Sequence, residues 1–120
     1  MKRALSLLLL ACLFIPALAG EVGALCIRDG GVAVYRPNGS WSTTINCSEA
    51  AIDAQSDGST IAVLHRNGAV SIYDKNGSWR GNINTGNGVR LQVVSGCIIV
   101  HHANGSATVY DKSGSWRGTL

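Results

Sequence analysis

The stretch VYRPNGSW at residues 34–41 decides the fold, because the chain contains it in three versions. It returns as IYDKNGSW at residues 72–79 and as VYDKSGSW at residues 109–116. The tyrosines of the three copies are 38 and then 37 residues apart, and the tryptophans keep the same spacing. A period of this length is typical of an array of one supersecondary unit, whose neighbours stack to bury a shared core. Such arrays usually bind partners rather than catalyse reactions.

Each repeat reads as short β-strands between turns. In the second repeat, Asn67-Gly68 and Asn76-Gly77 flank the strand that ends in the repeated tyrosine, and both are hairpin dipeptides. No apolar period of 3.6 residues is present, so helices are not expected. The predicted strands are 25–27, 32–35 and 41–45 in the first repeat, 50–54, 61–65, 70–73 and 79–83 in the second, and 89–94, 97–101, 107–110 and 116–120 in the third.

Four short antiparallel strands in 37 or 38 residues resemble a β-propeller blade of the general WD40 or NHL-like kind. The Gly-His and Trp-Asp signatures of true WD40 repeats are missing. The resemblance implies an all-β fold of three tandem four-stranded repeats, a partial β-propeller. The first repeat lacks a leading strand, so eleven strands are expected. Three blades are fewer than a closed ring needs, and open sheet edges favour association, so a homo-oligomer is expected.

A second resemblance leads to an alternative fold. The phrase NGAVSIY of the second repeat is similar to the bulb-type mannose-binding lectin repeat, whose sugar motif is Gln-x-Asp-x-Asn-x-Val-x-Tyr. Counting back from Tyr73, the three sugar-binding positions hold His65, Asn67 and Ala69. Across the three repeats only Asp29 retains a residue of the motif. This resemblance implies a β-prism and a carbohydrate-binding, lectin-like function with a degraded sugar site.

A signal peptide is predicted at residues 1–19. A positively charged start precedes an apolar run that is too short for a membrane-spanning helix, and Ala17-Leu18-Ala19 is a small-x-small cleavage site. No second apolar run follows, so the protein is expected to be secreted or periplasmic, without a membrane span. A lipoprotein site at Cys12 is the alternative. The expected mature domain covers residues 20–120, with repeats at about 20–46, 47–84 and 85–120.

Cleavage of the signal peptide would remove most of the excess of Lys and Arg over Asp and Glu. Loss of Lys2 and Arg3 leaves eight Lys and Arg against seven Asp and Glu, a net charge of +1. No basic cluster remains, so neither nucleic acid nor an anionic membrane is an expected partner.

Three cysteines remain in the expected mature chain, namely Cys26, Cys47 and Cys97. An exported protein favours one disulfide among them, and the odd number leaves one thiol unpaired or bonded between chains. None of the three occupies an equivalent position in its repeat, so the pairing stays open.

The repeated aromatic residues are the main candidates for function. We expect Tyr35, Tyr73 and Tyr110 to be structural. Trp41, Trp79 and Trp116 either pack between neighbouring sheets or bind a ligand, because tryptophans that directly follow a turn suit recognition at a loop rim. Arg80 and Arg117 follow two of these tryptophans and are candidates for ligand binding. Their alternative is a cross-strand pair with Asp74 or Asp111.

No nucleophile–base pair, metal-ligand cluster or phosphate loop is present in the sequence, so we expect neither an enzyme nor a cofactor or metal. The equivalent His65 and His102 are expected to make ordinary hydrogen bonds at strand ends rather than to bind a metal.

The sequence thus favours an exported, non-catalytic protein-interaction module that works as an oligomer. Its alternatives are a lectin-like protein and a structural subunit of an extracellular assembly. The partner is accordingly a protein or a glycan.

Overall fold

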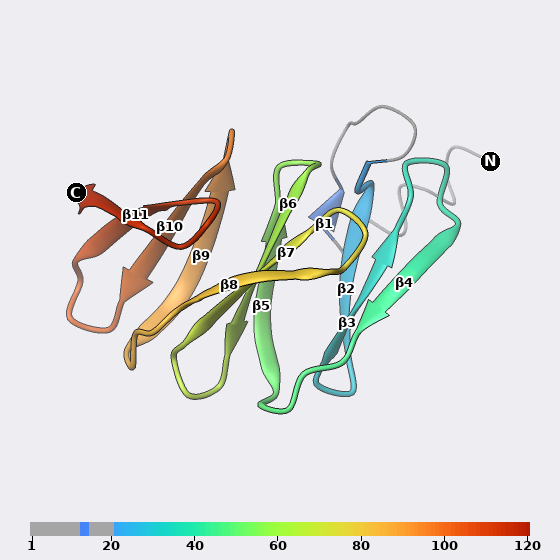
Figure 1. The fold of residues 1–120 in the computed structure, drawn as a ribbon. Coiled ribbons are helices and arrows are strands. Elements are labelled where there is room, and N and C mark those ends of the chain that lie inside the picture. The colour runs from blue at the N-terminus through green and yellow to red at the C-terminus, as the bar shows by residue number, and fades with distance from the viewer. Residues whose placement is uncertain (1–12, 15–20) are drawn as a thin grey trace.

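The computed structural model describes residues 13–14 and 21–120, which form three antiparallel β-sheets of four strands each. The sheets lie side by side in chain order, with the second between the other two (Figure 1). Within this described part, no helix is long and apolar enough to span a membrane. The strands are β1 (Leu13–Phe14), β2 (Ala24–Arg28), β3 (Gly31–Tyr35) and β4 (Trp41–Ile45); β5 (Ala51–Ser56), β6 (Thr60–His65), β7 (Val70–Asp74) and β8 (Trp79–Ile83); and β9 (Gly88–Val94), β10 (Cys97–His102), β11 (Ala107–Asp111) and β12 (Trp116–Thr119).

Each sheet is one sequence repeat, and its strands pair in chain order. The turn dipeptides explain why. Asp29 and Gly30 have φ angles of 53° and 79°, the left-handed conformation that a two-residue hairpin turn requires, and this turn joins β2 to β3 with Arg28 paired to Gly31. The eleven strands that the sequence predicts are therefore confirmed to within one or two residues.

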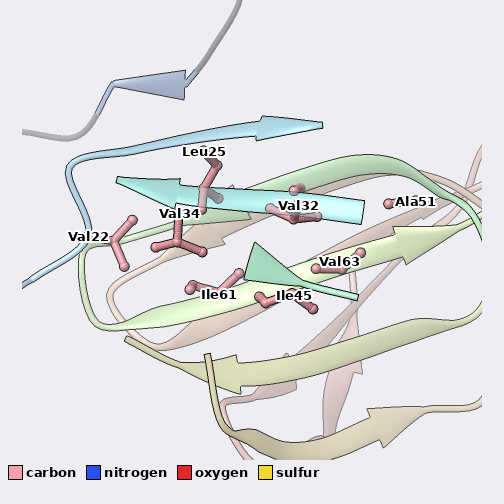
Figure 2. Packing of buried hydrophobic residues seen from close by; sticks show 9 residues of the cluster. Val22, Leu25, Val32, Val34, Ile45, Ala51, Ile61 and Val63 are labelled. Atoms are coloured by element: carbon pink, nitrogen blue, oxygen red, sulfur yellow. The ribbon is translucent and has the colours of Figure 1, made fainter. Parts of the chain in front are cut away.

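Two separate hydrophobic cores hold the three sheets together. In the first core, Val32, Val34 and Ile45 of the first sheet pack with Ile61 and Val63 of β6 (Figure 2). All of these side chains are buried, and complete burial of one aliphatic side chain contributes about 1.5–3 kcal/mol.

The second core lies on the other face of the second sheet. Ala62 and Leu64 of β6 pack there with Ile72 of β7, and with Ile98 and Val100 of the third sheet. Successive β6 residues therefore alternate between the two cores, as the period of a strand requires. This arrangement matches stacked blades. It differs from the alternative prism, in which three sheets would surround one shared core.

The first sheet differs from its predicted three strands. Leu13–Phe14 form a short fourth strand, β1, which pairs with Ala24 and Leu25 of β2. The physical reason is that the inner edge of β2 offers unpaired backbone groups, and an apolar segment attached to the chain satisfies some of them. The rest of the predicted signal peptide, its cleavage site and the alternative lipoprotein site lie outside the described residues.

Two aspartates of the second sheet bind backbone groups of the third. Asp53 Oδ2 accepts a hydrogen bond from Leu91 N at 3.1 Å, and Asp57 Oδ2 accepts one from Gly96 N at 2.6 Å. Partial burial alone would raise the pKa of Asp57, but the N–H groups of Thr60, Ser59 and Gly96 outweigh it and lower the pKa below its usual value.

We expect Asp57→Asn to destabilise the protein by about 1 kcal/mol at neutral pH, the lower end for hydrogen bonds to a charged group, because Asp57 is partly exposed. Since the folded pKa lies below the unfolded one, this contribution is complete above the unfolded pKa of about 4 and is lost as the pH falls through the folded value. Thermal unfolding of both proteins between pH 2 and about pH 7 checks this. A stability difference that does not change with pH would contradict the electrostatic role.

Candidate functional site

The tryptophans Trp41, Trp79 and Trp116 lie on the surface, on the last strand of each sheet. Their side chains are 57%, 61% and 64% exposed, so they do not pack between the sheets as one of the two expectations had it. We call the surface that these three residues form the tryptophan rim. Exposed indoles at three equivalent positions are the most conspicuous surface feature of the described residues.

A β-bulge at the same place in each sheet explains this exposure. In the second sheet Tyr73 pairs with Trp79, but the preceding Ile72 pairs with Gly81, so Arg80 is an extra residue without a partner. The register shifts identically at Tyr35 in the first sheet and at Tyr110 in the third. A bulge bends its strand and re-aims the adjoining side chains, which here are the tryptophan of each sheet and, in the second and third sheets, Arg80 and Arg117.

Short hydrogen bonds orient two of the indoles. Trp41 Nε1 donates to Thr44 Oγ1, and Trp79 Nε1 donates to Asn82 Oδ1, both at 3.0 Å. Each acceptor lies three residues further along the same strand. The indole is thereby held in position without being buried, which lowers the entropy cost of binding a partner.

A guanidinium lies beside the tryptophan in each sheet. Arg80 and Arg117 approach Asp74 and Asp111 at 3.7 Å, as the cross-strand alternative predicted. In the first sheet Arg36 Nη1 instead donates to Trp41 O at 2.8 Å. The side chains of Arg80 and Arg117 remain 58% and 64% exposed, so these pairs leave most of each guanidinium accessible.

Asp111 of the third sheet is negatively charged at neutral pH. Its pKa is lowered to about 2 by hydrogen bonds from the Ser113 hydroxyl and the backbone N–H groups of Ser115 and Ser113, with a smaller effect of Arg117. The rim therefore presents both signs of charge around its indoles at any physiological pH.

Two shallow grooves adjoin the rim. One, of about 330 Å³, includes Tyr73, Asp74, Arg80 and Lys112 in its wall, and so lies between the second and third sheets. The other, of about 320 Å³, lies on the first sheet and includes Tyr35, Ala33 and Trp41. Both have mixed polar and apolar walls.

The tyrosines lie partly inside the molecule. Tyr73 packs against the first core and Tyr110 against the second, while Tyr35 is half-buried on the outer side of the first sheet. Burial raises the pKa of Tyr73.

These placements separate the roles of tyrosine and tryptophan. We expect Tyr73→Ala to lower the free energy of unfolding by about 2–3 kcal/mol, because it removes a partly buried ring from the first core. We expect Trp79→Ala to cost less than about 1 kcal/mol, because its ring is mostly in solvent. Urea unfolding of both variants measures this difference. Equal losses would show that the indole is packed.

The two equivalent histidines make repeated hydrogen bonds. His65 bonds through Nδ1 to Glu49 O and through Nε2 to Ser71 Oγ, both at 2.8 Å. His102 bonds at the same distance through Nδ1 to Asn87 Oδ1 and through Nε2 to Thr108 Oγ1. In both cases the Nε2 partner lies on the neighbouring strand. In residues 13–14 and 21–120, no group of three or more His, Cys, Asp or Glu side chains is placed to hold a metal.

The cysteine candidates do not bond to one another. Cys47, half-buried, and Cys97, exposed, are free thiols, so no bridge joins any two of Cys26, Cys47 and Cys97. Burial raises the pKa of Cys47, which makes its thiol less reactive.

Comparison with known proteins places the fold. No protein-family model matches the sequence, and no curated protein does so either. Among solved structures, BamB from Moraxella catarrhalis superposes on 87% of this chain with a TM-score of 0.70 and 18% identity. HIRA residues 644–1017 superpose on 86% of it with a TM-score of 0.63 and 12% identity.

Both neighbours are β-propeller proteins. The chain covers 34% of BamB and 36% of the HIRA fragment, so it spans about a third of each. Identities this low show a shared fold alone. The chain is therefore a partial β-propeller whose three sheets are blades.

Proposed function

We propose that this protein is an exported, non-catalytic protein-interaction module that works as an oligomer and binds its protein partner through the tryptophan rim. The observation that carries the proposal is the exposure of three indoles at equivalent positions, each beside a guanidinium. The fold shared with β-propeller proteins supports an interaction role, and the predicted signal peptide supports export.

The chemistry of the rim suits a protein surface. Tryptophan and arginine are the side chains most enriched among residues that dominate binding energy in protein interfaces. The indoles of Trp41 and Trp79 are already oriented by hydrogen bonds, so they lose little freedom on binding. The mixed charges of Asp74, Arg80 and Asp111 favour a partner with both acidic and basic groups.

Chemical cross-linking in the exporting cell tests this function. We expect a defined polypeptide to be cross-linked by the wild-type protein and lost from a variant carrying Trp41→Ser, Trp79→Ser and Trp116→Ser. The matched control replaces Ile52 and Val89 with serine, because both are half-exposed apolar residues outside the rim. Retention of the cross-link by the rim variant would refute the proposal.

The lectin-like alternative is supported by Trp41, which lies beside a groove, because an indole face stacks well on a sugar ring. A glycan array distinguishes this alternative from binding of a protein partner. Specific glycan binding that is lost in the Trp41→Ser variant would show that the protein recognises carbohydrates and would refute the protein partner. Growth into long filaments by both the rim variant and the wild type would instead favour a structural subunit.

A further inference from the structure

The structure brings three cationic residues together where the second and third blades meet. Lys75 and Arg80 of the second blade and Lys112 of the third line the groove of about 330 Å³ between these blades. We call this surface, formed by Lys75, Arg80 and Lys112, the basic groove. The two lysines are 37 residues apart in the sequence, which therefore shows no basic cluster. Both walls belong to described blades that adjoin in the chain, so the groove does not depend on residues before or after them.

A close backbone approach between the blades fixes the position of Lys112. This lysine begins the turn between β11 and β12, and the carbonyl oxygen of Ser113 in that turn lies 2.8 Å from the position of a Cβ atom at Gly81. From the same turn, a Cβ atom at Gly114 would lie 2.9 Å from the carbonyl oxygen of Asn82. The turn therefore rests on β8 and places Lys112 at the edge of the second blade.

Most of the positive charge in the basic groove lacks a counter-charge among the described residues. Asp74 is the one carboxylate in the wall, and its Oδ1 accepts hydrogen bonds from the backbone N–H groups of Asn76 and Ser78. Its Oδ2 lies 3.7 Å from Arg80 Nη1, which is too far for a hydrogen bond. Neither lysine has an ion-pair partner within the described part of the chain. Three cations thus face one carboxylate.

The equivalent positions of the first blade do not carry this charge. Pro37 aligns with Lys75, and Ser42 aligns with Arg80. The junction between the first and second blades therefore lacks two of the three cations. The cationic set is specific to one junction, whereas a charge that the blade fold itself required would be expected at both.

The chemistry of the basic groove suits carboxylates on a peptide. Guanidinium and ammonium groups donate charge-assisted hydrogen bonds to carboxylates. The hydroxyls of Ser59 and Thr60 line the same groove and bond to no described residue, so they add neutral donors. Ile72 and Tyr73 give the wall an apolar part against which a peptide can pack. A nucleic acid would instead need a continuous basic stripe, and Asp74 interrupts the positive charge here.

We infer that the basic groove binds an acidic segment of the protein partner, whose aspartate or glutamate side chains pair with Lys75, Arg80 and Lys112. The inference rests on the proposed function and adds the charge of the partner to it. Trp79 directly precedes Arg80 in β8, so a partner that lies on the tryptophan rim also reaches the groove. Binding should weaken as added salt screens these exposed pairs.

Fluorescence anisotropy with a short labelled peptide of alternating glutamate and glycine tests this inference, with its glutamine counterpart as the neutral probe. We expect the exported protein to bind the acidic probe at low salt, and the neutral probe about tenfold more weakly. A variant carrying Lys75→Gln and Lys112→Gln should bind the acidic probe about five- to tenfold more weakly than the wild type. The matched control carries Arg66→Gln and Arg90→Gln, which remove the same charge from exposed positions outside the groove. It should keep its affinity for the acidic probe within about twofold.

The outcomes separate the basic groove from the proposed function. Equal weakening by the two double variants, or equal binding of the two probes, would overturn the groove as a site for an acidic segment. Tighter binding of an oligothymidylate than of the acidic probe, lost in the lysine variant, would overturn it in favour of a nucleic acid. Absence of peptide binding by a protein that still yields the rim-dependent cross-link would overturn the inference and leave the proposed function standing. Retention of the cross-link by the tryptophan variant refutes the proposed function, whether or not the acidic probe binds.

Discussion

Replacing Ile72 with alanine should lower the free energy of unfolding by about 3–4 kcal/mol, within the range measured for fully buried aliphatic side chains. Ile72 is completely buried in the core between the second and third blades, where the loss of its side chain leaves a cavity. For a domain of about 100 residues this lowers the Tm by roughly 12 °C or more. Thermal and urea unfolding at one fixed chain concentration measure it, since association also shifts the apparent stability.

The control for this prediction is Ile52→Ala, since Ile52 is 50% exposed on strand β5 of the same sheet. We expect it to cost less than about 1 kcal/mol. Similar losses for the two variants would mean that the second and third blades are not packed face to face as described.

The second large effect concerns a glycine between blades. Gly68 has a φ of +89°, and a Cβ atom there would lie 2.6 Å from the backbone carbon of Gly86, in the segment that leads to the third blade. We expect Gly68→Ala to cost about 3–4 kcal/mol, because left-handed strain of 1–2 kcal/mol adds to a backbone clash. Urea unfolding measures the loss.

Gly105→Ala isolates the contribution of that clash. Gly105 is the equivalent turn residue of the third blade, with a φ of +92° and no described residue within 4 Å of its Cβ position. It should therefore cost only about 1–2 kcal/mol, the strain alone. Equal losses at Gly68 and Gly105 would show that the close approach between blades is absent.

The strands could be predicted from the sequence because turns and periodicity are local. Dipeptides such as Asp29-Gly30 favour a turn through their own backbone preferences, and the copies of one pattern located most strands more than once.

The exposure of the tryptophans was not predictable in this way. A single extra residue in a strand changes the face on which the adjoining side chains lie, and whether Arg80 is paired or bulged depends on its partner strand. The repeated interval of tyrosine and tryptophan suggested one shared environment. The structure instead divides them between the core and the rim.

The links through Asp53 and Asp57 were missed for a different reason. They join blades across 38 and 39 residues. Neither aspartate is repeated, since Arg90 and Val94 hold the equivalent positions of the third blade. Repetition therefore could not reveal them. The available signal was the departure from the repeat at these two acidic positions.

The central claim is that the three sheets stack as blades, with the turn of each following blade against the last strand of the blade before it, and an engineered disulfide tests it most directly. A Cβ atom added at Gly77 would lie 2.9 Å from Thr43 Cγ2, so a chain carrying Thr43→Cys and Gly77→Cys brings two thiols together. The control carries Thr43→Cys and Gly105→Cys, because no described residue lies within 4 Å of a Cβ atom at Gly105. Both chains also carry Cys97→Ser, which removes the exposed native thiol. On oxidation the account predicts an internal bridge in the first chain and none in the control. Absence of the bridge from the first chain, or equal bridging in the two, would contradict it.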